Sequence, residues 1–329
     1  MDARLQLRVQ RYGWDRAASS YEQAWEQALA PATTAVLNAA ELRPGERVLD
    51  VACGSGVLTR AAWRAVGSNG SEVVGTDISE LMLAEAAEGS PDCRFLRADA
   101  QTLDRLVPLE HFDAVLCGLG LMYMPDPEAA LATMTRCLRP GGRMAVSAWG
   151  ERGACGWADI FPIVDSRVRS EVCPMFFRLG TGNTLGQALR AAGLVDVQLS
   201  HPPTTLHYAN ADAACAAAFL SGPVALAYSR FDESTRRSVR AEYLASIERW
   251  REGERFEIPG TFVIASGQRP EATVDAYCKW VALMLSACVV AFNPASQIAA
   301  LSRSRTVTRW NVDGRKLTLK SSGINAAIR

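Results

Sequence analysis

Between Arg47 and Gly150 the sequence alternates short apolar runs with segments of helical periodicity. The apolar runs end at Gly, Pro or Asp and predict strands at Arg47–Val51, Glu72–Thr76, Cys93–Leu96, Asp113–Cys117 and Arg143–Ala148. The segments between them predict helices at Val57–Val66, Glu80–Glu88 and Pro127–Leu138. Because consecutive strands are separated by helices, the strands must form a parallel sheet with right-handed crossovers.

The sequence on either side of this region has a different pattern. Before it, Trp14–Ala40 predicts one or two helices that carry Trp14, Tyr21 and Trp25 on one face. After it, the sequence predicts helices at Ala154–Val168, Leu185–Ala192 and Ala211–Trp250, and strands at Val195–Leu199 and Thr261–Ser266. We therefore predict four parts: entry or lid helices at 1–40, a core at 41–150, the rest of the sheet with a helical cap at 151–269, and a tail of unknown role at 270–329.

Composition excludes several classes of protein. Lys plus Arg and Asp plus Glu both number 35, so no net positive field attracts nucleic acid or anionic lipid. The sequence has no run of about 18 apolar residues and no signal-peptide pattern. The nine cysteines form no CxxC pair and the three histidines are far apart in the sequence. We expect a cytoplasmic protein with no membrane span, no nucleic-acid partner and no metal site.

The segment Val48-Leu49-Asp50-Val51-Ala52-Cys53-Gly54-Ser55-Gly56 joins the first predicted strand to a helix through a glycine-rich turn. Glycines let the chain turn tightly and let a ligand approach the backbone closely. A dinucleotide site would need a third glycine where Thr59 stands. Asp50 would repel a pyrophosphate, but its charge suits a ligand with an ammonium and a sulfonium group. The turn therefore favours S-adenosylmethionine over NAD.

Two more acidic residues follow the next two predicted strands. Asp77 can accept hydrogen bonds from both hydroxyls of a ribose, because a carboxylate has two acceptor oxygens. Asp99 can accept one from the amino group of adenine. A single Asp at the end of a strand is more often a turn or capping residue. Acidic residues at three successive strand ends favour a ligand site.

Five segments in this order and spacing carry a resemblance to a known family: VLDVACGSG (48–56), VVGTDIS (73–79), FLRADAQTL (95–103), FDAVLCGLGLMYMPDP (112–127) and LRPGGRMAVSAWG (138–150). The chain resembles class I S-adenosylmethionine-dependent methyltransferases of the ubiquinone/menaquinone-biosynthesis-like, small-molecule group. Ala52 stands where the family often has glycine. The resemblance implies a Rossmann-like, doubly wound α/β fold. Its mostly parallel sheet would have seven strands, the last one antiparallel, and a helical cap near the C-terminal strands.

The resemblance also implies cofactor-binding residues. Asp50 and the backbone of Ala52, Cys53, Gly54 and Gly56 would hold the methionine part of S-adenosylmethionine. Asp77 and Ile78 would hold the ribose and one face of adenine, and Asp99, Ala100 and Gln101 the adenine edge. Cys117 and Gly118 would lie near the sulfonium. Tyr21 either closes over the cofactor or belongs to the core with Trp14 and Trp25.

We expect a small, apolar or aromatic methyl acceptor, because the segments predicted to line its pocket are aromatic and nearly free of charge. They are Leu119–Met124, Trp149, Trp157–Phe161, Phe176–Phe177 and Phe219–Tyr228. Ordinary packing of the cap is the alternative explanation for many of them. If the reaction needs a general base, His207 is the candidate, although a lone histidine is more often structural. An NAD-dependent oxidoreductase, a non-catalytic cofactor-binding partner subunit and a homodimer stay open as alternatives.

Overall fold

The computed structural model describes residues 3–169, 173, 175–271, 307–310 and 316–319. The chain divides into two compact units, Met1–Glu271 and Ala272–Arg329. In the second unit the described residues form an antiparallel pair of strands, β10 (Val307–Trp310) and β11 (Lys316–Leu319). No helix among the described residues combines the length and apolar character needed to cross a membrane.

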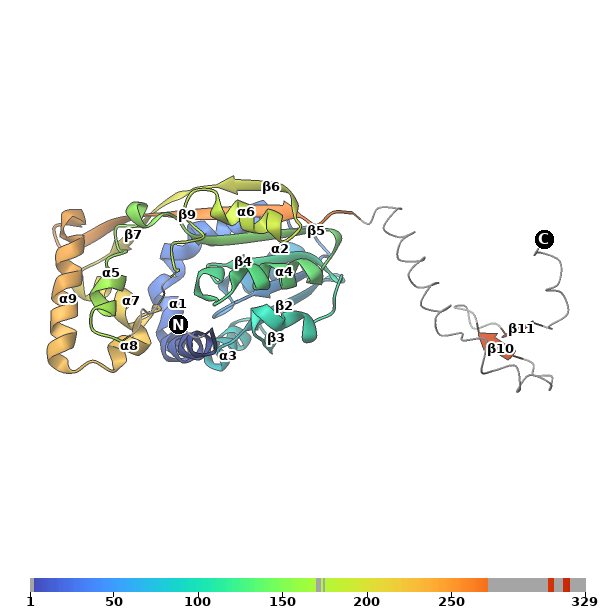
Figure 1. The fold of residues 1–329 in the computed structure, drawn as a ribbon, viewed down its shortest axis with the longest axis horizontal. Coiled ribbons are helices and arrows are strands. Elements are labelled where there is room, and N and C mark those ends of the chain that lie inside the picture. Colours follow the sequence, from blue (N-terminus) through green and yellow to red (C-terminus); the bar gives the residue numbers. More distant parts are fainter. Residues whose placement is uncertain (1–2, 170–172, 174, 272–306, 311–315, 320–329) are drawn as a thin grey trace, which may run out of the picture. The chain divides into compact units, whose positions relative to one another are not determined.

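A mostly parallel sheet runs through the first unit (Figure 1). Seven strands follow one another in the order β3-β2-β1-β4-β5-β9-β6. Their bounds are β1 Arg47–Val51, β2 Glu72–Asp77, β3 Arg94–Arg97, β4 Phe112–Gly118, β5 Leu138–Trp149, β6 Val195–Ser200 and β9 Arg255–Gln268. The first five are parallel, and β9 is antiparallel to both β5 and β6. The predicted fold class is confirmed.

The sheet extends further than the sequence analysis predicts. Strand β9 begins at Arg255, six positions before the predicted start at Thr261, and its first half pairs with two additional strands, β7 (Pro203–Tyr208) and β8 (Arg251–Glu252). Exposed and buried residues alternate from Arg255 to Gly260, as in a strand with one face in the core. His207 follows β6 in the chain, as predicted, but it lies within the additional strand β7.

The helices of the core agree with the predicted segments. They are α2 (Val57–Val66), α3 (Glu80–Gly89), α4 (Pro127–Cys137) and α6 (Thr184–Ala191), with short 3-10 turns at η1 (Ala100–Arg105) and η2 (Leu121–Tyr123). The predicted helix at Ala154–Val168 is only partly helical. It consists of a 3-10 turn, η3 (Arg152–Ala154), and a short helix, α5 (Ile160–Asp165).

A cap of helices lies between β7 and β9 in the sequence. It contains α7 (Ala211–Leu220), α8 (Ala225–Ser229), α9 (Glu233–Ile247) and the 3-10 turn η4 (Glu248–Trp250). Together with α5, these helices gather at one end of the sheet (Figure 1). Phe219 and Tyr243 from the cap and Phe256 from β9 are almost fully buried in the same hydrophobic core as the sheet. The cap is therefore packed onto the core.

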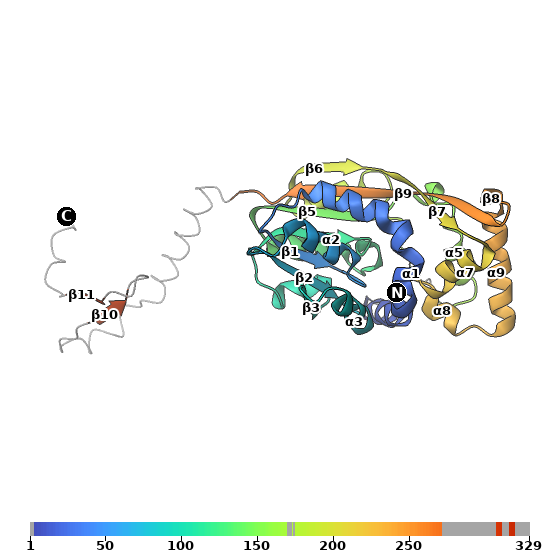
Figure 2. The ribbon, with the colours of Figure 1, turned by 180° about the vertical axis from the view of Figure 1, so that it is seen from behind.

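The N-terminal segment is one helix, α1 (Ala3–Ala40), with Pro31 inside it. This helix begins before the predicted Trp14. It contacts β5 and β9 of the sheet, α3 of the core and α7 and α8 of the cap. Figure 2 shows α1 passing from the side of β9 towards α3, beside the cap helices. Helix α1 thus reaches both the ends of the central strands and the cap.

Candidate functional site

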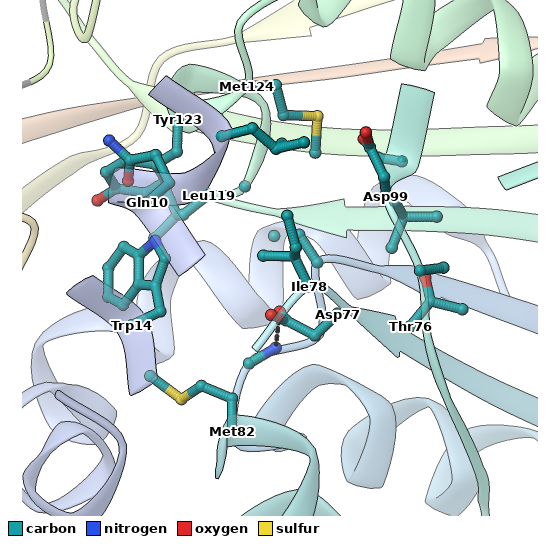
Figure 3. Close-up of a pocket in the computed structure, with 18 of the residues that line it drawn as sticks. Gln10, Trp14, Thr76, Asp77, Ile78, Met82, Asp99, Leu119, Tyr123 and Met124 are labelled. Atoms are coloured by element: carbon teal, nitrogen blue, oxygen red, sulfur yellow. Dashed lines mark hydrogen bonds between the residues drawn. The ribbon is translucent and has the colours of Figure 1, made fainter. Parts of the chain in front are cut away.

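A cavity lies at the carboxyl ends of β1, β2 and β4, with Gln10 and Trp14 of α1 on one side of it (Figure 3). Its space, including the part open to solvent, is about 750 Å³. The carboxyl ends of parallel strands are where open α/β sheets bind their ligands. The lining residues are Leu7, Gln10, Trp14, Tyr21, Val51, Ala52, Gly54, Thr76, Asp77, Ile78, Met82, Ala98, Asp99, Ala100, Gly118, Leu119, Gly120, Tyr123 and Met124.

The glycine-rich turn forms the floor of this cavity. Ala52, Gly54 and Gly56 all have positive φ angles, of 57°, 55° and 82°. The N–H of Gly54 donates to Oδ2 of Asp77 at 2.9 Å, and the N–H of Cys53 donates to the carbonyl oxygen of Thr76, also at 2.9 Å. These two bonds hold the turn against the end of β2. The backbone of Ala52 and Gly54 is thereby presented to a ligand with little side chain in between.

Asp77 is held by backbone groups on both sides. Oδ2 accepts from Gly54, and Oδ1 accepts from the N–H of Ser79 at 2.9 Å. Burial raises the pKa of the Asp77 carboxyl, and the backbone hydrogen bonds oppose this change. A carboxylate has about four lone-pair sites, so Asp77 can still accept from hydroxyl groups in the cavity. Figure 3 shows its carboxylate beside Ile78 and above Met82.

Asp99 both caps a helical turn and lines the cavity. It is the N-cap of η1, and its Oδ1 accepts from the backbone N–H of Gln101 at 3.0 Å. The side-chain amide of Gln101 donates to the same oxygen at 3.2 Å. Gln101 is therefore turned towards Asp99 and does not line the cavity, whereas Ala100 does. Asp99 therefore caps η1 and also lines the cavity, so the two roles are compatible.

The structure does not bring Asp50 to the cavity surface. Its side chain is fully buried, and the hydroxyl of Thr59 donates to Oδ2 at 2.6 Å. Oδ1 has no hydrogen-bond partner among the described residues, and burial raises the pKa of the carboxyl to about 7. The predicted direct contact between Asp50 and the methionine part is therefore not supported. Cys53, Gly56 and Cys117 also lie outside the lining of the cavity.

Several residues that line the cavity were not predicted from the sequence. Leu7 and Gln10 come from the part of α1 before the predicted helix, and Met82 comes from α3. Figure 3 shows Gln10, Trp14 and Tyr123 on one side of the cavity, with Thr76 and Asp99 on the other. Leu7, Gln10, Trp14 and Tyr21 are spaced by three, four and seven positions, which places them on one face of a helix. Extending the aromatic face of the predicted helix towards the N-terminus would have found Leu7 and Gln10.

A second cavity shares a wall with the first. Trp14, Tyr21, Leu119 and Tyr123 line both, and the second cavity has about 590 Å³ of space. Its other lining residues are Trp25, Leu29, Trp149, Trp157, Ile160, Phe176, Tyr208, Ala218, Ser221, Gly222, Pro223, Val224 and Tyr243. The described lining of the second cavity contains no Asp, Glu, Lys, Arg or His. Burial raises the pKa of its four tyrosines, Tyr21, Tyr123, Tyr208 and Tyr243, above the ordinary value of a phenol. The second cavity is therefore an uncharged, aromatic space.

His207 lies outside both cavities. Its side chain is exposed, its Nδ1 lies 3.6 Å from a carboxylate oxygen of Glu257 on the paired strand, and it lines a separate surface groove beside α1 and α7. It lines neither cavity, so the structure gives no support to the prediction that it acts as a base. In β7 the exposed His207 lies between the buried Leu206 and Tyr208. This alternation is typical of a strand, and it would have indicated that His207 faces solvent.

Comparisons with known proteins agree with this geometry. Residues 48–142 match the family model described as a methyltransferase domain. The chain is 30% identical over 222 residues to nocamycin O-methyltransferase from Saccharothrix syringae, covering 61% of this chain and 77% of that protein. It is 41% identical over 118 residues to the ubiquinone/menaquinone biosynthesis C-methyltransferase of Ectopseudomonas mendocina, covering 34% of this chain and 45% of that protein.

A solved structure adds support for the fold. The YcgJ protein of Bacillus subtilis is 16% identical, with a TM-score of 0.51, covering 74% of this chain and 99% of that chain. The chain spans about half the length of the curated relatives that it matches over shorter stretches. The relative from Saccharothrix is matched over most of its length, including segments beyond the glycine-rich core. The chain therefore belongs to the class I S-adenosylmethionine-dependent methyltransferases.

Proposed function

We propose that this protein transfers a methyl group from S-adenosylmethionine to a small, apolar or aromatic acceptor. The observation that carries the proposal is the shared wall between the two cavities. The first has carboxylates and exposed backbone at the strand ends, and the second is aromatic and without charge in its described lining. A methyltransferase needs such a pair of adjoining sites, because the acceptor must lie next to the methyl group.

The residues of the first cavity suit S-adenosylmethionine. Asp77 would accept from the ribose hydroxyls, with Ile78 against one face of adenine, and Asp99 and Ala100 would hold its edge. The backbone of Ala52, Gly54 and Gly118 would lie along the methionine and sulfonium part. The two carboxylates favour a positively charged ligand. When bound, this cofactor supplies an electrophilic methyl group on a positive sulfur.

The chain itself would bind, orient and cover the reactants. Trp14 and Tyr21 from α1 line both cavities and would exclude water from the boundary between them. The Tyr21 and Tyr123 hydroxyls are neutral at neutral pH, and burial raises their pKa further, so they can donate hydrogen bonds but cannot act as anionic bases. The contribution of the described residues is therefore orientation and desolvation.

The alternatives fit less well. In an NAD-dependent oxidoreductase the third glycine of the turn lets the helix pack closely against the strand, whereas here that position is Thr59, which is fully buried and bonded to Asp50. A non-catalytic partner subunit would not need a second cavity beside the cofactor site. The names of the relatives, an O-methyltransferase and a quinone-pathway C-methyltransferase, also support a small-molecule acceptor. A cytoplasmic location and a homodimer stay predictions from the sequence.

Isothermal titration tests the cofactor site. We expect the wild type to bind S-adenosylmethionine and S-adenosylhomocysteine but not NAD. Asp77→Asn should weaken both sulfur ligands by about tenfold or more, because it removes charge-assisted hydrogen bonds worth roughly 1.5–3 kcal/mol. Asp126→Asn is the matched control, since Asp126 caps α4 and lines neither cavity. A folded wild-type protein that binds neither sulfur ligand would contradict the proposal.

A further inference from the structure

Trp157 is the one lining residue of the aromatic cavity whose polar atom is buried without a partner among the described residues. Trp157 is 6% exposed, and its Nε1 has no hydrogen-bond partner among the described residues. Another tryptophan of this cavity, Trp25, donates from Nε1 to the carbonyl oxygen of Ser221 at 3.0 Å. Buried indole N–H groups normally find such an acceptor.

The Trp157 ring lies in a cluster of aromatic side chains. The ring packs against Trp149, Phe176, Phe177 and Phe161, with centroid distances of 4.8, 5.6, 5.8 and 6.1 Å. Leaving a buried donor unsatisfied costs about 1–3 kcal/mol. Since Trp157 also lines the second cavity, a molecule bound there can supply the missing acceptor atom.

The backbone that carries Trp157 is held firmly. The N–H of Gly156 donates to the carbonyl oxygen of Pro259 at 2.8 Å, and the ring of Trp250 packs so closely that a Cβ at Gly156 would lie 2.5 Å from it. On the other side, the N–H of Ala158 donates to the carbonyl oxygen of Cys155 at 3.0 Å. The backbone on both sides of Trp157 is thus held before a ligand binds, and a donor on an ordered backbone loses less entropy on binding.

We propose that Trp157 determines acceptor specificity by donating a hydrogen bond from Nε1 to an oxygen atom of the acceptor. The acceptor is then an aromatic or alicyclic molecule with a hydroxyl or carbonyl oxygen on its ring, and a pure hydrocarbon of the same shape is disfavoured. This assignment rests on the proposed function, because it takes the second cavity as the acceptor site. The neutral hydroxyls of Tyr208 and Tyr243, which line the same cavity, are further donors for such a molecule.

A matched pair of probes tests the assignment. 1-Naphthol and 1-methylnaphthalene have similar shapes, but only the first has an oxygen. Their affinities are measured by equilibrium dialysis against protein saturated with S-adenosylhomocysteine. In the variant Trp157→Phe, which keeps an aromatic ring without the N–H, we expect 1-naphthol to bind about tenfold more weakly and 1-methylnaphthalene to change by less than about twofold. Trp25→Phe is the control, because Trp25 lines the same cavity but its N–H is already bonded to Ser221, and it should change both affinities by the same factor.

Three results would overturn the assignment: an equal loss for both probes in Trp157→Phe, no loss for either, or no binding of either probe to the loaded wild type. Circular dichroism and binding of S-adenosylhomocysteine by calorimetry are measured for every variant. Trp157 does not line the first cavity, so Trp157→Phe should retain the wild-type affinity for that ligand. A wild type that fails to bind S-adenosylhomocysteine contradicts the proposed function, whereas normal binding without probe discrimination contradicts only the role of Trp157.

Discussion

At the scale of single residues, the cofactor cavity depends on a close approach between Ala52 and Gly120. A Cβ placed on Gly120 would lie 2.5 Å from the Cβ of Ala52 and 3.0 Å from the sulfur of Cys117. Gly120 has φ −93° and ψ −39°, which any residue can adopt, so glycine is needed there for space and not for conformation. Ala52, in contrast, has a left-handed backbone that costs a residue with a Cβ roughly 1–2 kcal/mol.

We therefore expect Gly120→Ala to lower the free energy of unfolding by about 1–3 kcal/mol, because two methyl groups would occupy the same space. The double variant Ala52→Gly/Gly120→Ala should recover most of this loss, since it removes the colliding Cβ and the left-handed strain together. Urea denaturation of the wild type, both single variants and the double variant measures the coupling. Additive effects of the two substitutions would show that these residues do not contact each other.

At the scale of elements, the first half of α1 is attached to the core by a few polar contacts. Oδ1 of Asp15 accepts from the hydroxyl of Ser79 at 2.6 Å, and Ser79 in turn accepts from the N–H of Met82 as the N-cap of α3. Arg60 of α2 pairs with Glu22 at 2.5 Å. The residues of α1 between and before these contacts cover the first cavity. The stability of this half of α1 therefore affects access to the cofactor site.

We expect Asp15→Ala to loosen this half of α1. The amides of residues 3–25 should exchange with deuterium about tenfold faster, as for the loss of a hydrogen bond to a charged group. S-adenosylhomocysteine should slow this exchange again if α1 covers it. Asp232→Ala is the control, because Asp232 caps α9 by accepting from Thr235 and does not contact α1. Unchanged exchange in α1 of the Asp15 variant would mean that apolar packing alone holds the helix.

At the scale of the whole molecule, every described residue that lines the two cavities belongs to the unit Met1–Glu271. This unit has its own core, which joins the sheet, α1 and the cap. A chain ending at Glu271 should therefore fold in one cooperative transition and bind S-adenosylhomocysteine within about twofold of the full-length affinity. Calorimetry of both chains makes the comparison. Loss of folding or of binding on truncation would assign the remaining residues to the site.

Local sequence patterns predict the parts of the fold that depend on interactions between neighbouring residues. Strands β1 to β5 and helices α2 to α4 follow from apolar runs, helical spacing and the turn residues at their ends, all of which act over a few neighbouring positions. The strand-end positions of Asp77 and Asp99 follow from the same patterns, and both side chains line the cavity. In contrast, β7 was not predicted. It is stabilised by pairing with β9, which lies about 50 positions later in the chain, and a local pattern does not show such a partner.

The site itself depends on contacts between distant segments. The sequence alone establishes the family, the parallel sheet and the strand ends at which the cofactor cavity forms, since each rests on motifs of contiguous residues. Whether a side chain faces the cavity depends on packing: Asp50 turns inwards to Thr59, His207 faces solvent on β7, and Trp157 enters a cluster of rings from three separate segments. Burial and hydrogen bonding in the packed protein decide these orientations, so they cannot be predicted from the periodicity of a short segment.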